Sequence, residues 1–132
     1  MAENTKFVID TSALISFLLP DEVSNKRVKQ VFSNFVEDHY TFYAPYLLIY
    51  EVGNVLKTAT LRNRVSTKDA KDLFEKFLNF PITFSKVDCI KVLDLSIKHD
   101  ISFYDASYLQ LSIQKKADLL TTDKRLAKLL KV

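Results

Sequence analysis

The chain has 132 residues, of which 48% are hydrophobic and 12% aromatic, so it carries ample material for one domain with a buried core. No apolar run approaches the length of a membrane span, and the polar residues 1–6 (MAENTK) are unlike a secretory signal, so we expect a cytoplasmic protein without membrane contact. The single cysteine, Cys89, excludes an internal disulfide and is expected to pack within a helix. The sequence contains one glycine, Gly53, which is too few for the glycine-rich loops that bind nucleoside triphosphates and dinucleotides.

Strand-like and helix-like patterns alternate along the chain. In the first half we expect a strand over residues 6–10, helices over 12–19 and 21–37, a strand over 41–44 and helices over 46–61 and 66–80. In the second half we expect a strand over 82–85, helices over 88–98 and 102–114, a strand over 119–122 and a helix over 124–130. This alternation favours an α/β fold with three layers, α/β/α, around a central, mainly parallel sheet with right-handed crossovers.

The helix expected over residues 66–80 has a broad apolar face. Its members recur at helical spacing: Leu73, Phe74, Phe77, Leu78 and Phe80. Such a face fits either the hydrophobic core or a surface for a partner protein.

Four acidic residues lie at the ends or on the flanks of these elements: Asp10, Glu51, Asp105 and Asp123. Asp10 ends the first strand and Asp123 follows the last one, so both belong at the carboxyl edge of a parallel sheet, where open α/β folds bind ligands. Glu51 and Asp105 lie on helical segments that can face the same edge. Four carboxylates gathered there would repel one another unless a hard divalent cation, usually Mg²⁺ or Mn²⁺, neutralised them. The pattern predicts a metal-dependent phosphoryl-transfer enzyme with these four acids as catalytic residues and metal ligands.

The charge balance of the remaining chain suits a polyanionic substrate. The sequence has 19 basic and 16 acidic residues, a net charge of +3, and removing the four site acids leaves 12 acidic residues and a balance of +7. Basic side chains around an acidic site fit nucleic acid as the substrate, because lysines can hold backbone phosphates. The same lysines also fit a purely solubilising role on the surface.

Each acid also has an ordinary structural interpretation. Asp10 and Asp123 precede helices and fit helix N-caps, while Ser102 and Asp105 have the spacing of a capping box, each worth about 1 kcal/mol. Glu51 lies within a helix beside an apolar stripe and fits a surface glutamate. Caps alone do not explain why all four acids fall on one predicted edge.

Neutral polar residues near the acids are candidates for a supporting role. A hydroxyl or amide can orient a carboxylate or contact a phosphate without adding charge, which makes Ser12 and Asn54 candidates. Thr11 and Thr122 are weaker candidates of the same kind. For all four, local hydrogen bonding to the backbone near a strand end or helix start is the alternative.

Four segments together resemble the successive motifs of the PIN-domain ribonucleases, in the family's order: residues 7–14 (FVIDTSAL), 51–54 (EVGN), 103–109 (FYDASYL) and 120–126 (LTTDKRL). The chain is most similar to the small single-domain members of the VapC toxin type. The resemblance runs from about residue 6 to residue 127 and implies one PIN-like nuclease domain over residues 1–132. Family members often end with a further strand, whereas this chain stops at residues 130–132 (LKV), which leaves the sheet edge near the C-terminus open.

The resemblance implies a ribonuclease in which Asp10, Glu51, Asp105 and Asp123 bind one or two Mg²⁺ or Mn²⁺ ions and cleave single-stranded or loop RNA. It further implies an antitoxin protein as partner, as in a type II toxin–antitoxin pair, and a homodimer. An RNA-processing nuclease without an antitoxin and an inactive PIN-like interaction module remain alternatives. A receiver-like phosphoacceptor domain shares the alternating pattern but leaves Glu51 and Asp123 unexplained.

Overall fold

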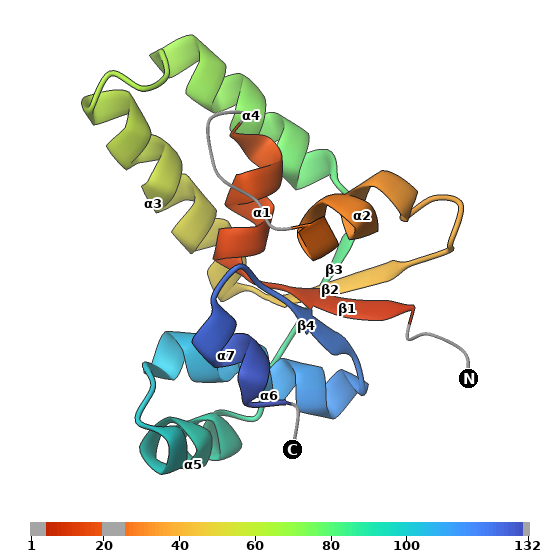
Figure 1. The fold of residues 1–132 in the computed structure, drawn as a ribbon. Helices are drawn as coiled ribbons and strands as arrows, with labels where there is room; N and C mark the ends of the chain where they lie inside the picture. Colours follow the sequence, from red (N-terminus) through yellow and green to blue (C-terminus); the bar gives the residue numbers. More distant parts are fainter. Residues whose placement is uncertain (1–4, 20–25, 131–132) are drawn as a thin grey trace.

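The protein is described by a computed structural model over residues 5–19 and 26–130 (Figure 1). Its elements follow the predicted alternation: β1 (Lys6–Ile9), α1 (Thr11–Leu18), α2 (Lys26–Asn34), β2 (Thr41–Pro45), α3 (Leu47–Leu61), α4 (Thr67–Asn79), β3 (Ile82–Ser85), α5 (Cys89–His99), α6 (Phe103–Lys115), β4 (Asp118–Leu120) and α7 (Lys124–Lys128). The predicted order of strands and helices is therefore confirmed along the described chain.

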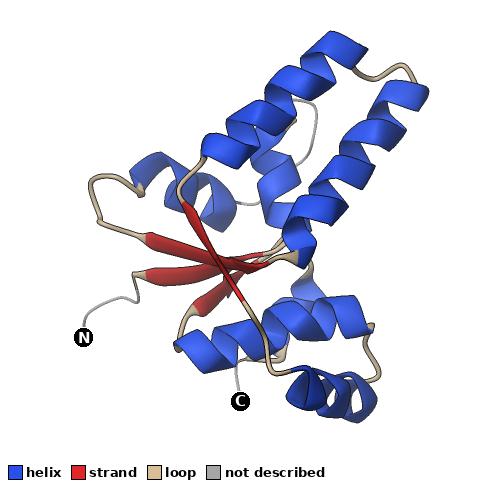
Figure 2. Ribbon diagram, turned by 180° about the vertical axis from the view of Figure 1, so that it is seen from behind, coloured by secondary structure: helices blue, strands red, loops and turns tan. Residues whose placement is uncertain are grey.

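The strands form a parallel sheet in the order β3-β2-β1-β4. Phe7 of β1 pairs with Phe42 of β2, and Val8 pairs with Leu119 of β4. Helices cover both faces, with α1 to α4 on one side and α5 to α7 on the other (Figures 1 and 2). This arrangement confirms the predicted three-layer α/β/α class.

The strand order reverses next to β1. The chain adds β2 and β3 on one side of β1 and then returns to add β4 on the other side. Because a right-handed crossover changes face when the direction of growth changes, α5 and α6 lie on the face opposite to α1 to α4. The carboxyl ends of β1 and β4 thus flank the switch point at which open α/β sheets bind their ligands.

Polar side chains fix where the helices begin. Asp10, Ser66, Asp88, Ser102 and Asp123 are the N-caps of α1, α4, α5, α6 and α7, and each accepts a hydrogen bond from a backbone N–H of the first turn. Such bonds satisfy donors that have no partner within the helix. The capping interpretation of Asp10 and Asp123 is therefore correct, and it does not exclude a second role for their free oxygens.

Helix ends are formed without glycine. Asp100 and Lys116, which follow α5 and α6, adopt the left-handed conformation with φ of 51° and 52°. The guanidinium of Arg125 donates to the carbonyl oxygens of His99 and Asp100 at 3.3 and 3.0 Å. This contact satisfies two terminal carbonyls of α5 and ties α7 to that end of the helix.

A cluster of phenylalanines, which we call the aromatic layer, joins α1, α2 and α4 to the sheet. It consists of Phe17, Phe32, Phe35, Phe42 and Phe80. Phe17 and Phe32 stack with ring centroids 4.3 Å apart, and Phe80 lies 5.2 to 5.5 Å from Phe17, Phe35 and Phe42. Burial of these rings stabilises the packing of the three helices on this face of the sheet.

Several details differ from the sequence-based expectations. The predicted start of the helix over residues 21–37 lies outside the described residues. The predicted end is too late, because α2 ends at Asn34, after which Phe35 packs in the aromatic layer and Val36 is exposed. Cys89 was expected to pack but is exposed, as the first residue of α5. In the apolar face of α4, Phe77 is buried and Phe80 belongs to the aromatic layer, so those two residues are core and not a partner surface. Within the described residues, every helix is too short or too polar to cross a membrane.

Candidate active site at the carboxyl edge of the sheet

Asp10 is the buried acid of the site, with 6% of its surface exposed. Its Oδ1 accepts hydrogen bonds from the Ser12 hydroxyl at 2.7 Å and from the Ala13 backbone N–H at 3.0 Å. Burial raises the pKa of Asp10, the nearby charge of Asp105 adds to that rise, and the hydrogen bonds from Thr121, Ala13 and Ser12 oppose it. The fold therefore holds a carboxylate in a place where its charge is unfavourable without a cation.

Ser12 and Thr121 connect the ends of β1 and β4. The Ser12 hydroxyl lies 3.3 Å from the Thr121 hydroxyl and accepts the Thr122 backbone N–H at 3.0 Å. The Thr121 hydroxyl accepts the Asp123 backbone N–H at 3.0 Å. Ser12 thus contacts both Asp10 and the loop that carries Asp123. Thr122 contributes its backbone N–H to this network.

Glu51 is held by two hydroxyl groups from distant parts of the chain. Its Oε1 accepts hydrogen bonds from Thr11 at 2.8 Å and from Tyr108 at 2.5 Å. The two hydroxyl oxygens lie 3.1 Å apart, so the three side chains form a closed cluster. Burial raises the pKa of Tyr108 and its bond to Glu51 raises it further, so the tyrosine stays protonated and remains a donor. Glu51 is therefore not an ordinary surface glutamate.

Asp105 and Asp123 are the more open acids. Asp105 lies in the first turn of α6. Partial burial raises the pKa of Asp105, and the charges of Asp123 and Glu51 raise it further. The hydrogen bond from Ser102 and the charge of Arg125 oppose this rise. Asp123 is exposed, and its Oδ1 accepts the backbone N–H groups of Arg125 and Leu126 at 2.9 and 3.2 Å. Both acids sit at helix N-termini, where the helix dipole favours a negative charge.

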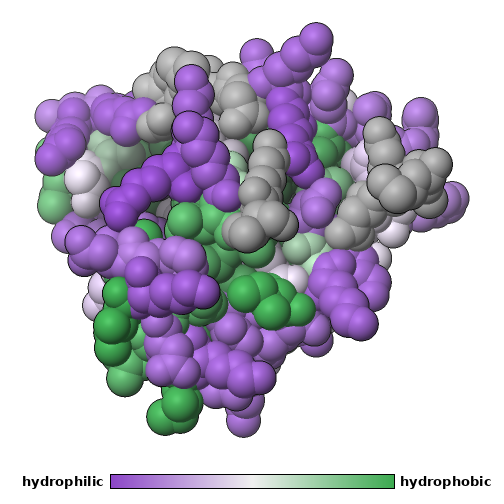
Figure 3. Space-filling model, turned by 60° about the horizontal axis from the view of Figure 1, so that its bottom comes forward, coloured by the Kyte–Doolittle hydropathy of each residue, from purple (hydrophilic) through white to green (hydrophobic). Residues whose placement is uncertain are grey.

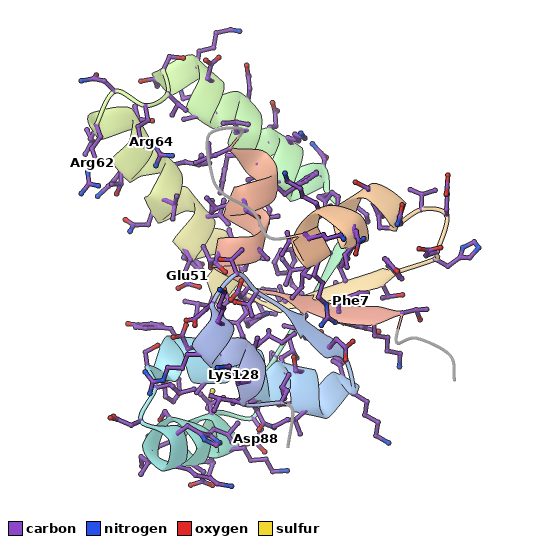
Figure 4. All side chains as sticks on the ribbon, viewed as in Figure 1. Phe7, Glu51, Arg62, Arg64, Asp88 and Lys128 are labelled. Atoms are coloured by element: carbon purple, nitrogen blue, oxygen red, sulfur yellow. The ribbon has the colours of Figure 1, made fainter. Side chains whose placement is uncertain are left out.

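The four predicted acids share one electrostatic neighbourhood. The charges of Asp123 and Glu51 raise the pKa of Asp105, and the charge of Asp105 raises the pKa of Asp10. Figure 4 places Glu51 where the starts of α1 and α3 meet the loop before α7. In the described ranges, however, no three Asp, Glu, His or Cys side chains come close enough to hold a metal ion. Carboxylate oxygens are the donors that a hard cation such as Mg²⁺ or Mn²⁺ prefers.

Sequence reasoning did not name two of the residues that contact this network, and it ranked a third as a weaker candidate. Tyr108 and Thr121 were not candidates, although a tyrosine three residues after Asp105 on a buried helix needs a hydroxyl partner and so carried a signal. Thr11 was a weaker candidate, yet it binds Glu51 directly. Asn54 is exposed and lines a hollow with Glu51 and Tyr104, which places it to meet a ligand more than to orient an acid.

The fold and the acidic edge define a known class of protein. The PIN domain family matches residues 7–131, and the chain belongs to this family. Among its relatives, Ribonuclease VapC3 of Pyrobaculum aerophilum is 30% identical over 126 residues, which cover 92% of each chain. Ribonuclease VapC1 of Mycobacterium tuberculosis is 27% identical over 122 residues, covering 91% of this chain and 87% of the relative. The predicted resemblance to single-domain, VapC-type PIN proteins is thus confirmed.

Solved structures show the same fold. PAE2754 from Pyrobaculum aerophilum superposes with a TM-score of 0.71 at 21% identity, covering 92% of this chain and 82% of the other. VapC20 of Mycobacterium tuberculosis, a toxin that cleaves the sarcin–ricin loop, superposes with a TM-score of 0.68 at 13% identity, covering 94% and 95%. At these identities the likeness concerns the fold alone.

Proposed function

We propose that this chain is a divalent-metal-dependent ribonuclease that cleaves RNA phosphodiester bonds as the toxin of a type II toxin–antitoxin pair. The observation that carries the proposal is the coupled set of acids at the switch point of the sheet, where Asp10 is buried with a raised pKa and Asp105 senses two further acids. Membership of the PIN family and the ribonuclease names of the relatives support it.

The four acids bind the metal in this proposal, and four hydroxyl groups orient two of the acids. Asp10, Glu51, Asp105 and Asp123 hold Mg²⁺ or Mn²⁺, which when bound offsets charge on the phosphate and lowers the pKa of a water molecule. Ser12 and Thr121 orient Asp10, and they fix its carboxylate before substrate arrives. Thr11 and Tyr108 do the same for Glu51. Because these four partners are neutral hydroxyls, they add no charge that would compete with the cation.

The decisive experiment compares Asp10→Asn and Asp105→Asn with wild type on a mixed RNA pool, in Mg²⁺, in Mn²⁺ and in chelator. We expect both substitutions to abolish cleavage and leave the fold intact, because a charged ligand is lost at constant volume. Asp69→Asn is the matched control, because the Asp69 backbone N–H binds Ser66 as that of Asp105 binds Ser102, at 3.0 Å in both helices. A wild type that is inert with metal, or an Asp10→Asn variant that cleaves normally, overturns the proposal.

The toxin assignment adds two partners, an antitoxin protein and a second copy of the chain. The support is the VapC name of the relatives, which belongs to those proteins. We expect expression of the wild type to arrest growth and co-expression of a small neighbouring reading frame to relieve it, with sedimentation of the purified chain reporting a dimer. Growth arrest that Asp10→Asn retains contradicts a toxin that acts by cleaving RNA.

A further inference from the structure

The acidic edge continues into two adjoining hollows. One, of about 300 Å³, lies between α3 and α6 and is lined in part by Tyr50, Glu51, Asn54 and Tyr104. The other, of about 370 Å³, also includes Tyr104 and extends past the carboxyl ends of β2 and β3. These volumes are at the lower end of the range for small-molecule sites, so each hollow has room for a planar group rather than a large ligand.

All exposed aromatic residues of the described chain line these hollows. Twelve of its sixteen phenylalanine and tyrosine side chains are buried or half-buried, and the exposed ones are Tyr46, Tyr50, Phe103 and Tyr104, at 53%, 76%, 43% and 60%. The other large exposed apolar side chains are aliphatic, as on α5 and α6, on the side that Figure 3 brings forward. Chance exposure would scatter the aromatic rings, whereas this concentration marks a binding surface.

The charges around the hollows exclude ion pairing as their main source of affinity. Of the described residues that line them, only Glu51 and Lys86 are charged. Without metal the acids next to them repel phosphate, so an RNA chain needs another attraction at this place. Aromatic faces supply it, because a base stacks on them whatever its identity. Asn54, four residues after Tyr50 on the same side of α3, offers a donor and an acceptor to the edge of a base.

We propose that the two hollows form a stacking platform for unpaired RNA bases next to the scissile phosphate, with Tyr50 and Tyr104 as the principal stacking residues. The proposal rests on the ribonuclease function proposed above. Tyr50 and Tyr104 line the same hollow as Glu51, so bases on these rings bring their phosphate beside that acid. A base within a duplex has no free face, and the platform therefore selects unpaired nucleotides.

The test measures binding of a short unstructured RNA in chelator, where no metal-dependent cleavage can occur. Tyr50→Ala and Tyr104→Ala should each weaken binding by roughly 5- to 150-fold, the range that stacking of one base provides. Tyr50→Phe and Tyr104→Phe should bind as wild type does, because the ring is kept. Leu61→Ala is the matched control, since Leu61 is 74% exposed at the far end of the same helix.

Two further readouts separate stacking from other causes. The slope of affinity against salt concentration should be the same in the alanine variants as in wild type, because no phosphate contact is removed. Replacing a base next to the mapped cleavage position by an abasic nucleotide should weaken wild-type binding but leave Tyr104→Ala unaffected. Unchanged RNA affinity in both alanine variants overturns the platform and indicates a protein-binding surface, and equal losses in the phenylalanine variants also overturn it. A wild type that binds RNA in this way but never cleaves it refutes the ribonuclease function and leaves the platform standing.

Discussion

The aromatic layer and the carboxyl edge lie in the same small domain and are built on opposite principles. In the aromatic layer, rings such as Phe32 and Phe42 are nearly fully buried, contact one another and leave no polar group to satisfy. At the carboxyl edge, Asp10 is buried as well, but burial raises its pKa and the neighbouring acid Asp105 adds to the rise. The first region stabilises the fold, whereas the second brings acids together and raises the pKa of Asp10 and of Asp105, which lowers the stability of the folded chain at neutral pH.

The two regions are joined through α1. Phe17 on this helix belongs to the aromatic layer, while Asp10 caps its first turn and Thr11 and Ser12 hold two acids of the site. The layer thus fixes the helix whose first residues orient the carboxylates. Substitutions in the layer should change the amount of folded protein, and substitutions at the edge should change what the folded protein does.

The largest effect on stability is expected from Phe42→Ala. Phe42 is 1% exposed and lies 5.5 Å from Phe80 and 5.8 Å from Phe32 and Phe35 between ring centroids, so its removal leaves a cavity in the layer. We expect a loss of about 3–5 kcal/mol in the free energy of unfolding, measured by urea denaturation. Val36→Ala, at an exposed position, should change it little. A loss below about 1 kcal/mol for Phe42→Ala contradicts the role assigned to the aromatic layer.

Tyr108→Phe should affect both regions, because Tyr108 is a core residue that donates to a site acid. Losing a hydrogen bond to a carboxylate should lower stability by about 1.5–3 kcal/mol. Thr11 alone then holds Glu51, so we expect RNA cleavage to fall by about 10–100-fold. Tyr43→Phe is the control, a half-buried tyrosine whose ring contacts Lys115, at the opposite end of α6 from Asp105. Wild-type cleavage by Tyr108→Phe removes the tyrosine from the site.

The fold was largely predictable, because most strands and helices have a hydrophobic pattern that can be recognised within a short stretch of sequence. Apolar runs ending at Asp10 and before Asp123 are local signals, and the alternation of strands and helices then places both acids at one edge. The exception is the end of α2, where the apolar residues Phe35 and Val36 extend the helical pattern beyond Asn34. Periodicity cannot tell a helical residue from one that turns into a core.

The sequence was enough to propose four acids as a candidate site, but not to find the residues that contact them. The bond from Tyr108 to Glu51 joins residues 57 positions apart, and the pair formed by Thr11 and Tyr108 joins residues 97 apart. Neither spacing follows from any local period, so only the packing of α1, α3 and α6 reveals the cluster. The prediction that Cys89 packs was wrong for a related reason. Residue type predicts burial only on average, and it does not say whether a particular cysteine is exposed.

The folded protein should become more stable when one of the charges at the carboxyl edge is removed. The pKa of Asp105 is raised in the folded chain by partial burial and by Asp123 and Glu51. A raised carboxyl pKa means that the folded state binds more protons than the unfolded state, so the penalty is absent below the unfolded pKa of about 3.9 and complete once the pH exceeds the folded pKa. Asp105→Asn should therefore stabilise the metal-free protein at pH 7, by about 1 kcal/mol or less because the group is half-exposed, and have little effect at about pH 3.

Melting curves in chelator and in Mn²⁺ extend the same test. Metal should raise the melting temperature of wild type by relieving repulsion among the acids, and it should raise that of Asp105→Asn less. Asp69→Asn, in the equivalent turn of α4, should respond to metal as wild type does. If metal shifts wild type and Asp105→Asn equally, the four acids do not form a shared site.

The smallest effect is expected from Gly53→Ala, which should change the stability of the protein but not its activity, although Gly53 lies on the same helix as Glu51. Gly53 lies within α3 two residues after Glu51, has no positive φ, and faces α4, where an added Cβ would lie 3.7 and 3.8 Å from ring carbons of Phe74. Those distances are ordinary van der Waals contacts, so alanine fits without displacing the ring. Because glycine within a helix is less stable than alanine by about 0.5–1 kcal/mol, the variant should melt a few degrees higher and cleave RNA at the wild-type rate. A lower melting temperature would show that the packing of α3 against α4 has no room for a methyl group, and a changed cleavage rate would show that this packing controls the position of Glu51.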